Sequence, residues 1–151
     1  MVATAGPDQG GAFVKAVGET NTGGIMVPDA WYPGAQNALT HIMDQMYTAK
    51  YGGNISQISA DTAEAFSAGN ALAAAVKGTH SLSNSKIISY LHSGVTIQTV
   101  QGPVKFNSIG ETFGLTFVFQ WQHGKFVQAL PVGAAGSVKA LFPKPTWGQG
   151  G

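Results

Sequence analysis

The chain has 151 residues, 44% of them hydrophobic, which suffices for one compact domain and is too short for two ordinary ones. Its eight basic residues are all lysine, its net charge is +1, and charges of one sign never cluster, which excludes the basic patch that nucleic-acid binding requires. The absence of cysteine excludes disulfides, thiolate catalysis and cysteine-ligated zinc.

Only 10% of the residues are charged, well below the usual quarter, and small or polar residues take their place. This composition favours an extracytoplasmic or an acid-tolerant protein. No apolar run approaches the length of a membrane span. The first residues, MVATAGPDQGG, have neither the basic nor the apolar region of a signal peptide, so we expect no export signal within this sequence.

The first third of the chain predicts a short helix, a strand and a longer helix. Residues 1–11 are glycine-rich and turn-like, and residues 12–17 suit one short helical turn before Gly18. The apolar run at residues 24–27, between glycine and proline, predicts a short buried strand. Beyond Gly34, apolar residues recur at helical spacing and predict a helix that ends at residues 52–53. This stripe consists of Leu39, Ile42, Met43, Met46 and Tyr47.

The middle of the chain predicts a second long helix, which begins after Ser59 as N-cap and ends near residues 77–78. Asp61 and Glu64 lie in its first turns, where the helix dipole favours acidic side chains. Alanine, glycine and serine occupy nearly every face of this helix. Such small side chains predict close packing against a sheet or another helix. A third helix is expected from a Ser83 or Asn84 cap to Gly94.

From Val95 onward the pattern is that of β-structure. The segments VTIQTV and GPVKF suit short strands, and a turn is expected at residues 107–110. Then Leu115, Phe117, Phe119 and Trp121 alternate with Thr116, Val118, Gln120 and Gln122. With His123 and Gly124 as a two-residue turn, and renewed alternation over residues 125–130, this predicts a β-hairpin. The proline-rich tail, residues 143–151, suits a strap or a frayed end, and we expect residues 1–151 to form a single unit.

Motifs for catalysis or metal binding do not occur in the sequence. The four histidines, at positions 41, 80, 92 and 123, lack a second ligand type at helical or strand spacing, so we expect surface or turn roles and no metal. Serines fall at helix starts, and no G-x-S-x-G turn is present. The glycines lack the spacing of a phosphate loop. We therefore expect neither enzymatic activity nor a cofactor.

The aromatic residues leave two interpretations open. Those of the hairpin could form a platform for a ligand, but their alternating positions favour the core. They are Phe113, Phe117, Phe119, Trp121 and Phe126. Trp31, Tyr32 and Trp147 lie in loops flanked by proline and glycine, where an aromatic side chain has less reason to be purely core, so a role in recognition stays open.

Three segments together resemble the type I periplasmic solute-binding proteins of ABC importers, in the branched-chain amino acid and amide group. These segments are GPDQGGAFVKAVGETNTGGIMVPDAWYP, SADTAEAFSAGNALAAAVKG and TVQGPVKFNSIGETFGLTFVFQWQHGKFVQALP. The last is the most specific, with Gly102-Pro103, Phe106, the turn at residues 107–110 and the hairpin motif at residues 120–125. The resemblance implies a partial α/β fold, in which helices pack on a sheet with a C-terminal hairpin or meander and the N-terminal lobe sequence is missing.

The resemblance also implies two ligand-binding residues. Asp8 matches the family's acidic position that pairs with the α-ammonium group of a substrate, and it reads equally well as a solvated turn aspartate. Asp61 falls near a pocket-side position where the family often has an aromatic residue, although a helix-start role is the stronger interpretation. The implied ligand is an amino acid or a small amide, bound without covalent chemistry by hinge closure. The resemblance also implies an ABC membrane permease as partner and a location outside the cytoplasm, either periplasmic or at the cell surface.

We therefore expect a solute-binding component of an ABC importer, or a portion of one. The alternative is a truncated or self-associating unit of the same fold that binds no solute. An enzyme would require Asp8 or Asp61 to converge with a histidine. Because unpaired strand edges and uncovered helix faces favour association, we also expect a homo-oligomer or a complementary N-terminal lobe as partner.

Overall fold

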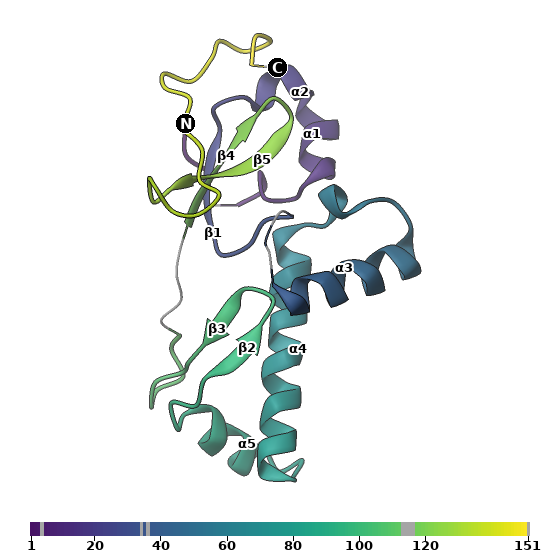
Figure 1. The fold of residues 1–151 in the computed structure, drawn as a ribbon, viewed down its shortest axis with the longest axis vertical. Helices are drawn as coiled ribbons and strands as arrows, with labels where there is room; N and C mark the ends of the chain where they lie inside the picture. Colours follow the sequence, from purple (N-terminus) through teal and green to yellow (C-terminus); the bar gives the residue numbers. More distant parts are fainter. Residues whose placement is uncertain (4, 34, 36, 113–116, 151) are drawn as a thin grey trace.

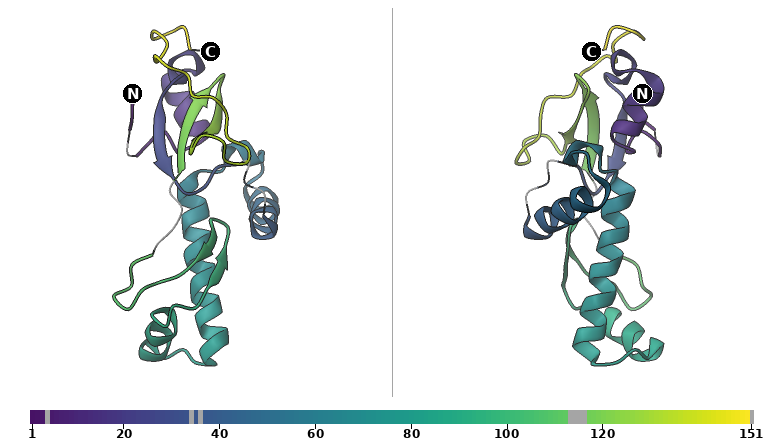
Figure 2. Two further views of the ribbon diagram at one scale, coloured as in Figure 1. Left: turned by 60° about the vertical axis from the view of Figure 1, so that its left-hand side comes forward. Right: turned by 90° about the vertical axis from the view of Figure 1, so that its right-hand side faces the viewer.

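The computed structural model describes residues 1–3, 5–33, 35, 37–112 and 117–150. The molecule is elongated, with a body built around a sheet at one end and a body built along one long helix at the other (Figures 1 and 2). Its elements are α1 (Gly11–Val17), α2 (Glu19–Thr22), β1 (Met26–Asp29), α3 (Ala38–Tyr51), the 3-10 turn η1 (Ile55–Gln57), α4 (Ala60–Thr79), α5 (Asn84–Leu91), β2 (Ile97–Thr99), β3 (Gly102–Val104), β4 (Phe117–Gln122) and β5 (Lys125–Leu130). This is a mixed α/β fold, as predicted.

The two bodies differ in composition. The sheet body contains α1, α2, the strands β1, β4 and β5, and the C-terminal tail, whereas the long-helix body contains most of α4 with α5, β2 and β3 (Figure 1). The helix α3 lies beside the junction of the two bodies (Figure 2). Within the described residues, every helix is too short or too polar to cross a membrane.

The long helices begin where the sequence places their caps. The side chain of Asn37 accepts the N–H of Thr40 at 2.9 Å at the start of α3, and the side chain of Ser59 accepts the N–H of Thr62 at 3.4 Å at the start of α4. Gly52 ends α3 with φ at 74°, a left-handed conformation that glycine adopts without strain. These local signals explain why the predicted helices are confirmed.

The helix α4 buries its small residues along one face only. Ala60, Ala63, Ser67, Ala71 and Ala75 are buried at helical spacing, and the helix packs against β2 and α5. The closest approach occurs at Gly78, where a Cβ atom would lie 2.3 Å from the ring of Tyr90. The predicted close packing is therefore confirmed for this face.

The sheet of the sheet body has the order β1-β4-β5 with antiparallel pairing. The hairpin β4-β5 turns at His123 and Gly124, both with positive φ, as a two-residue turn requires. The strand predicted at residues 24–27 lies two residues later. On its other edge β1 receives a parallel bridge from Val2, with Met26 N–H bonded to the Met1 carbonyl at 2.9 Å. The strand β4 is thus the central strand of the three-stranded sheet, and the bridge from Val2 pairs with the free edge of β1.

Alternation along β4 does not separate a core face from a solvent face, because the chain that follows the hairpin covers the second face. Phe119 and Gln120 are both fully buried. The Gln120 side chain donates to the Leu141 carbonyl at 3.0 Å and accepts the Leu141 N–H at 2.7 Å. Gln122 likewise donates to the carbonyl of Lys139 at 2.9 Å. The other positions expected in or near this strand, Phe113, Leu115 and Thr116, lie outside the described residues, as does Gly34.

The tail returns to the N-terminal part of the sheet body. The N–H of Gly150 donates to the carbonyl of Thr20 at 2.8 Å, and the N–H of Gly148 donates to the side chain of Asn21 at 2.7 Å. The Lys144 ammonium lies 3.8 Å from the centre of the Trp147 ring. These contacts place residues 148–150 against α2.

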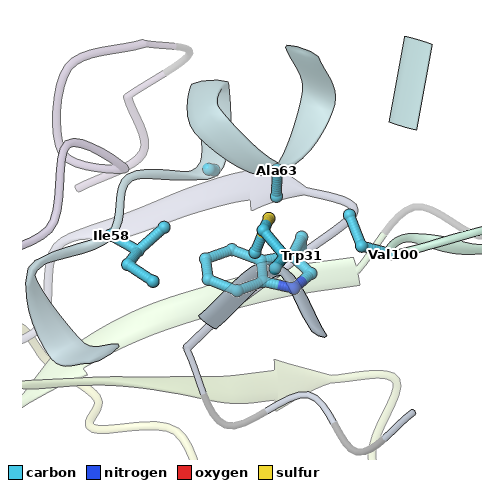
Figure 3. Close-up of a cluster of buried hydrophobic side chains, with 6 residues drawn as sticks. Trp31, Ile58, Ala63 and Val100 are labelled. Carbon is cyan, nitrogen blue, oxygen red and sulfur yellow. The ribbon is translucent and has the colours of Figure 1, made fainter. Parts of the chain in front are cut away.

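The hydrophobic core at the junction is centred on Trp31 (Figure 3). Trp31 is 1% exposed and packs among side chains from α3, from the residue after η1, from the start of α4 and from the turn after β2. Its buried companions are Met43, Ile58, Ala60, Ala63 and Val100. The tryptophan for which a recognition role was left open is therefore a core residue, and one side of it also lines the cavity described next.

Candidate functional site

A cavity of about 540 Å³ lies where the loop before α1 meets the turn before α4 and the β4-β5 hairpin. We call it the Asp8 cavity. Its volume is in the range of small-molecule sites. Apolar walls come from Trp31, Ile58, Trp121 and Phe126, and the rings of Trp121 and Phe126 lie 5.2 Å apart. The cavity thus combines an aromatic wall with the acidic side chain that gives it its name.

Asp8 is held in place by its backbone neighbours. The indole N–H of Trp121 donates to the carbonyl of Pro7 at 2.7 Å, and the N–H of Ala60 donates to the carbonyl of Asp8 at 3.3 Å. The loop is therefore fastened to β4 on one side and to α4 on the other. The carboxylate oxygen Oδ1 of Asp8 is buried and has no hydrogen-bond partner among the described residues. An unpaired buried acceptor is costly, so this oxygen is suited to accept a donor from a ligand.

The remaining polar side chains of the cavity differ in whether they are already hydrogen-bonded within the protein or can contact a ligand. Lys15 and Lys125 line it and are exposed, so the cavity presents both signs of charge. The amides of Asn54 and Gln57 are engaged in a reciprocal cap of η1, with the Asn54 N–H donating to Gln57 Oε1 at 3.0 Å and the Ser56 N–H donating to Asn54 Oδ1 at 3.0 Å. Asp8 is therefore the acidic group, and the two lysines are the cationic groups, that a charged ligand would meet.

Asp61, the second residue singled out from the sequence, lies outside the described lining of this cavity. It is exposed in the first turn of α4, and its Oδ2 accepts a hydrogen bond from the side chain of Gln9. These surroundings match the helix-start role more closely than a ligand contact. The structure thus does not bring the two predicted residues together.

Asp29, at the end of β1, is an acidic residue that the sequence pattern did not single out. It is 9% exposed, its Oδ1 accepts the N–H groups of Ala30 at 2.6 Å and Trp31 at 3.3 Å, and its Oδ2 is buried without a partner among the described residues. Burial raises the pKa of Asp29 from 3.8 to about 6, against the lowering effect of the two backbone hydrogen bonds. The nearby carboxylates of Asp8 and Glu64 raise it further. No local signal reveals this, because the neighbours come from distant segments.

Other chemistry finds little support at this site. Among the residues that the structure describes, no three histidine, cysteine, aspartate or glutamate side chains lie close enough together to hold a metal ion. The described lining of the Asp8 cavity includes no histidine, so neither Asp8 nor Asp61 is paired there with a general base. The arrangement is suited to non-covalent binding.

Comparison with known proteins also points to a binding protein. The family model described as periplasmic binding protein matches residues 1–125, which is most of the chain. The protein belongs to the periplasmic binding protein family. This confirms the predicted resemblance. No curated protein matches the chain significantly.

Solved structures with the same fold include amino acid and solute binding proteins. The leucine binding protein LivK from Thermotoga maritima is 19% identical with a TM-score of 0.63, over 78% of this chain and 33% of that one. A solute binding protein from R. palustris in complex with benzoate is 18% identical with a TM-score of 0.62, over 85% and 35%. LivJ from Streptococcus pneumoniae in complex with isoleucine is 20% identical with a TM-score of 0.62, over 76% and 32%. The chain spans about a third of the length of these structures, and the predicted partial fold is confirmed.

Proposed function

We propose that this protein is a solute-binding component, or a portion of one, of an ABC importer, and that it binds an amino acid or a small amide in the Asp8 cavity. Membership of the periplasmic binding protein family supports binding as the activity. The observation on which the proposal rests is the buried Oδ1 of Asp8, which has no hydrogen-bond partner among the described residues and lies at a cavity of suitable volume. In this proposal the protein works outside the cytoplasm, delivers its solute to a membrane permease and is not an enzyme.

In this proposal, different residues of the cavity contact different parts of the ligand. A ligand ammonium or amide N–H donates to the carboxylate of Asp8. The ligand's apolar part lies against Trp121 and Phe126, and Lys15 or Lys125 provides a counter-charge for a ligand carboxylate. Binding proteins of this kind close two lobes over the ligand. We propose that a complementary N-terminal lobe, or a second copy of this chain, provides the covering surface.

The test is thermal unfolding of the purified protein against glycine, leucine, glutamine and acetamide. A ligand that binds only the native state stabilises it by about 2.7 kcal/mol at a hundredfold excess over its Kd. We expect at least one compound to raise the unfolding temperature, and the Asp8→Asn variant to lose that increase. Asp61→Asn is the matched control and should keep it, because Asp61 lies outside the cavity lining.

Two results would contradict this proposal. One is the absence of a shift with all four compounds in a well-folded protein. The other is an equal shift in wild type and Asp8→Asn. A loss of the shift in Asp61→Asn alone would instead restore Asp61 as the ligand contact and displace Asp8.

The alternative function is that of a self-associating unit that binds no solute. The observation in its favour is a set of exposed apolar side chains outside the sheet body. Ile42 and Met46 of α3 are 47% and 59% exposed, and Leu72 of α4 is 54% exposed. Such a unit would bury these side chains against a second copy, and its Asp8 cavity would stay without a ligand.

A further inference from the structure

A second cavity, of about 370 Å³, lies on the other side of the segment that follows β1. Residues of this segment divide between the two cavities. Trp31 and Pro33 line the Asp8 cavity, whereas Ala30, Tyr32 and Ala35 line the second one. Neighbouring residues of this segment therefore line opposite sides of it. The two cavities are therefore separate sites that share one wall.

The second cavity, which we call the Gln128 cavity, is formed by both bodies of the molecule. Tyr32, Phe117 of β4 and Gln128 of β5 come from the sheet body, and the turn at residues 100–102 comes from the long-helix body. Figure 1 shows the β2-β3 turn reaching toward the sheet body at this level. A molecule bound here would contact both bodies at once.

Gln128 provides a buried polar group at this cavity that lacks a hydrogen-bond partner among the described residues. The side chain is 5% exposed, and its Nε2 is buried with no hydrogen-bond partner among the described residues. The backbone carbonyl of Gln128 is already occupied by the N–H of Val138 at 2.9 Å. A buried amide donor without an acceptor is costly, and such groups are rare in native proteins unless something binds them. We therefore expect the Gln128 amide to donate a hydrogen bond to an acceptor oxygen or nitrogen of a ligand.

The other lining groups indicate which kind of ligand would provide that acceptor. The described lining of the Gln128 cavity contains no charged side chain, in contrast to Asp8, Lys15 and Lys125 of the first cavity. Tyr32 and Phe117 supply aromatic surface, and both pack against Phe119 with ring centres 5.2 Å and 6.1 Å away.

Two other side-chain amides line the cavity, that of Asn37 and that of the half-buried Gln101, and the Asn37 amide is already committed. Asn37 donates to the carbonyl of Val100 at 2.9 Å and accepts the N–H of Thr40 at 2.9 Å. A neutral, flat and largely apolar ligand fits these walls, with its acceptor on Gln128.

We propose that the Gln128 cavity is a second binding site, for a small neutral molecule with a planar apolar body and a carbonyl acceptor that bonds the Nε2 of Gln128. This site is independent of the proposed solute site, because the two cavities have different polar groups. A ligand here ties the turn at residues 100–102 to β5. It therefore stabilises the arrangement of the two bodies in which this cavity is formed.

Acetophenone is a suitable probe, because it is neutral and planar, carries one carbonyl acceptor and has no N–H group to donate to Asp8. We expect saturable binding by ligand-observed NMR titration of the whole protein. Gln128→Leu, which removes the donor, should weaken binding about tenfold, as should the volume-matched Gln128→Met. Asp8→Asn should leave the affinity for acetophenone unchanged, so that failure of this site and failure of the solute site are distinguished.

A second readout separates a ligand-binding amide from a structural one. If the Nε2 of Gln128 has no partner in the unliganded protein, Gln128→Leu and Gln128→Met should unfold at the same temperature as wild type or higher. Unfolding several degrees lower in both variants would show that the amide serves the fold through an ordered water, and would overturn the proposal. Absence of saturable acetophenone binding, an affinity unchanged in both Gln128 variants, or binding lost in Asp8→Asn would overturn it as well.

Discussion

At the scale of single residues, Asp29 makes the stability of the protein depend on pH. Its native pKa of about 6 lies above its ordinary value of 3.8, so between these values the folded state binds more protons than the unfolded state. The stabilisation from its protonated form is complete below about pH 4 and is lost as pH rises through about 6. By linkage, this loss amounts to about 3 kcal/mol.

Replacement of this carboxyl by an amide isolates its effect. Asp29→Asn keeps an oxygen for the N–H groups of Ala30 and Trp31 but cannot ionise. The variant should therefore be more stable than wild type at pH 7, and the difference should disappear near pH 4. Urea unfolding of both proteins at pH 4, 5, 6 and 7 measures this. An equal dependence on pH in the two proteins would show that Asp29 keeps an ordinary pKa.

Residues such as Asp29 and Gln120 also show where prediction from sequence ends. Asp8 could be singled out because its short motif, Gly6-Pro7-Asp8, carries a family resemblance. The charges of Asp8 and Glu64 contribute to the raised pKa of Asp29, and the buried side chain of Gln120 is hydrogen-bonded to the backbone of Leu141. These partners are distant along the chain, and a local pattern contains no information about them.

At the scale of elements, the close contact between α4 and α5 depends on Gly78. A methyl group at this position would meet the Tyr90 ring, whereas one at Gly69 of the same helix meets no atom within 4 Å. Alanine is the better helix former by about 1 kcal/mol. Gly69→Ala should therefore stabilise the protein by roughly 0.5–1 kcal/mol. Gly78→Ala should instead destabilise it by about 1 kcal/mol or more, because the ring is displaced.

Chemical denaturation of the two alanine variants compares these effects directly. A third variant, Gly78→Ala with Tyr90→Ala, removes the obstructing ring, and there the added methyl should no longer be harmful relative to Tyr90→Ala alone. Equal stabilisation by both single alanine substitutions would mean that α5 does not pack against α4 at Gly78.

Most elements were predictable because their signals are local. Caps at Asn37 and Ser59, the glycine after α3 and the His123-Gly124 turn act within a few residues. The strand β1 was predicted two residues early, because its limits are set by pairing with β4 and not by its own composition. The division of the segment after β1 between two cavities likewise requires the tertiary structure.

At the scale of the whole molecule, the Trp31 core joins α3, the start of α4 and the turn after β2 (Figure 3). This shared core supports the proposal that residues 1–151 form one folding unit. The molecule nevertheless exposes apolar side chains on α3 and α4. Contiguous exposed apolar surface favours association.

We predict that the protein self-associates through these helices at tens of micromolar concentration. Sedimentation velocity should then show a dimer or larger species, and replacing Ile42 and Met46 by glutamate should shift the distribution toward monomer. Leu130→Glu is a matched control, because Leu130 is 39% exposed but lies on β5. A monomer at all concentrations, or equal effects of both sets of substitutions, would contradict an interface on α3.

The central claim is that the Asp8 carboxylate receives the cationic or N–H donor of a solute. Calorimetric titration tests it most directly when the amino acid that binds best is compared with its analogue lacking the amino group, in wild type and in Asp8→Asn. The account predicts that losing the ammonium weakens binding at least tenfold in wild type and has little effect in Asp8→Asn, since the interaction is then already absent. An equal loss in both proteins would show that the ammonium is bound elsewhere and that the Asp8 cavity is not its site.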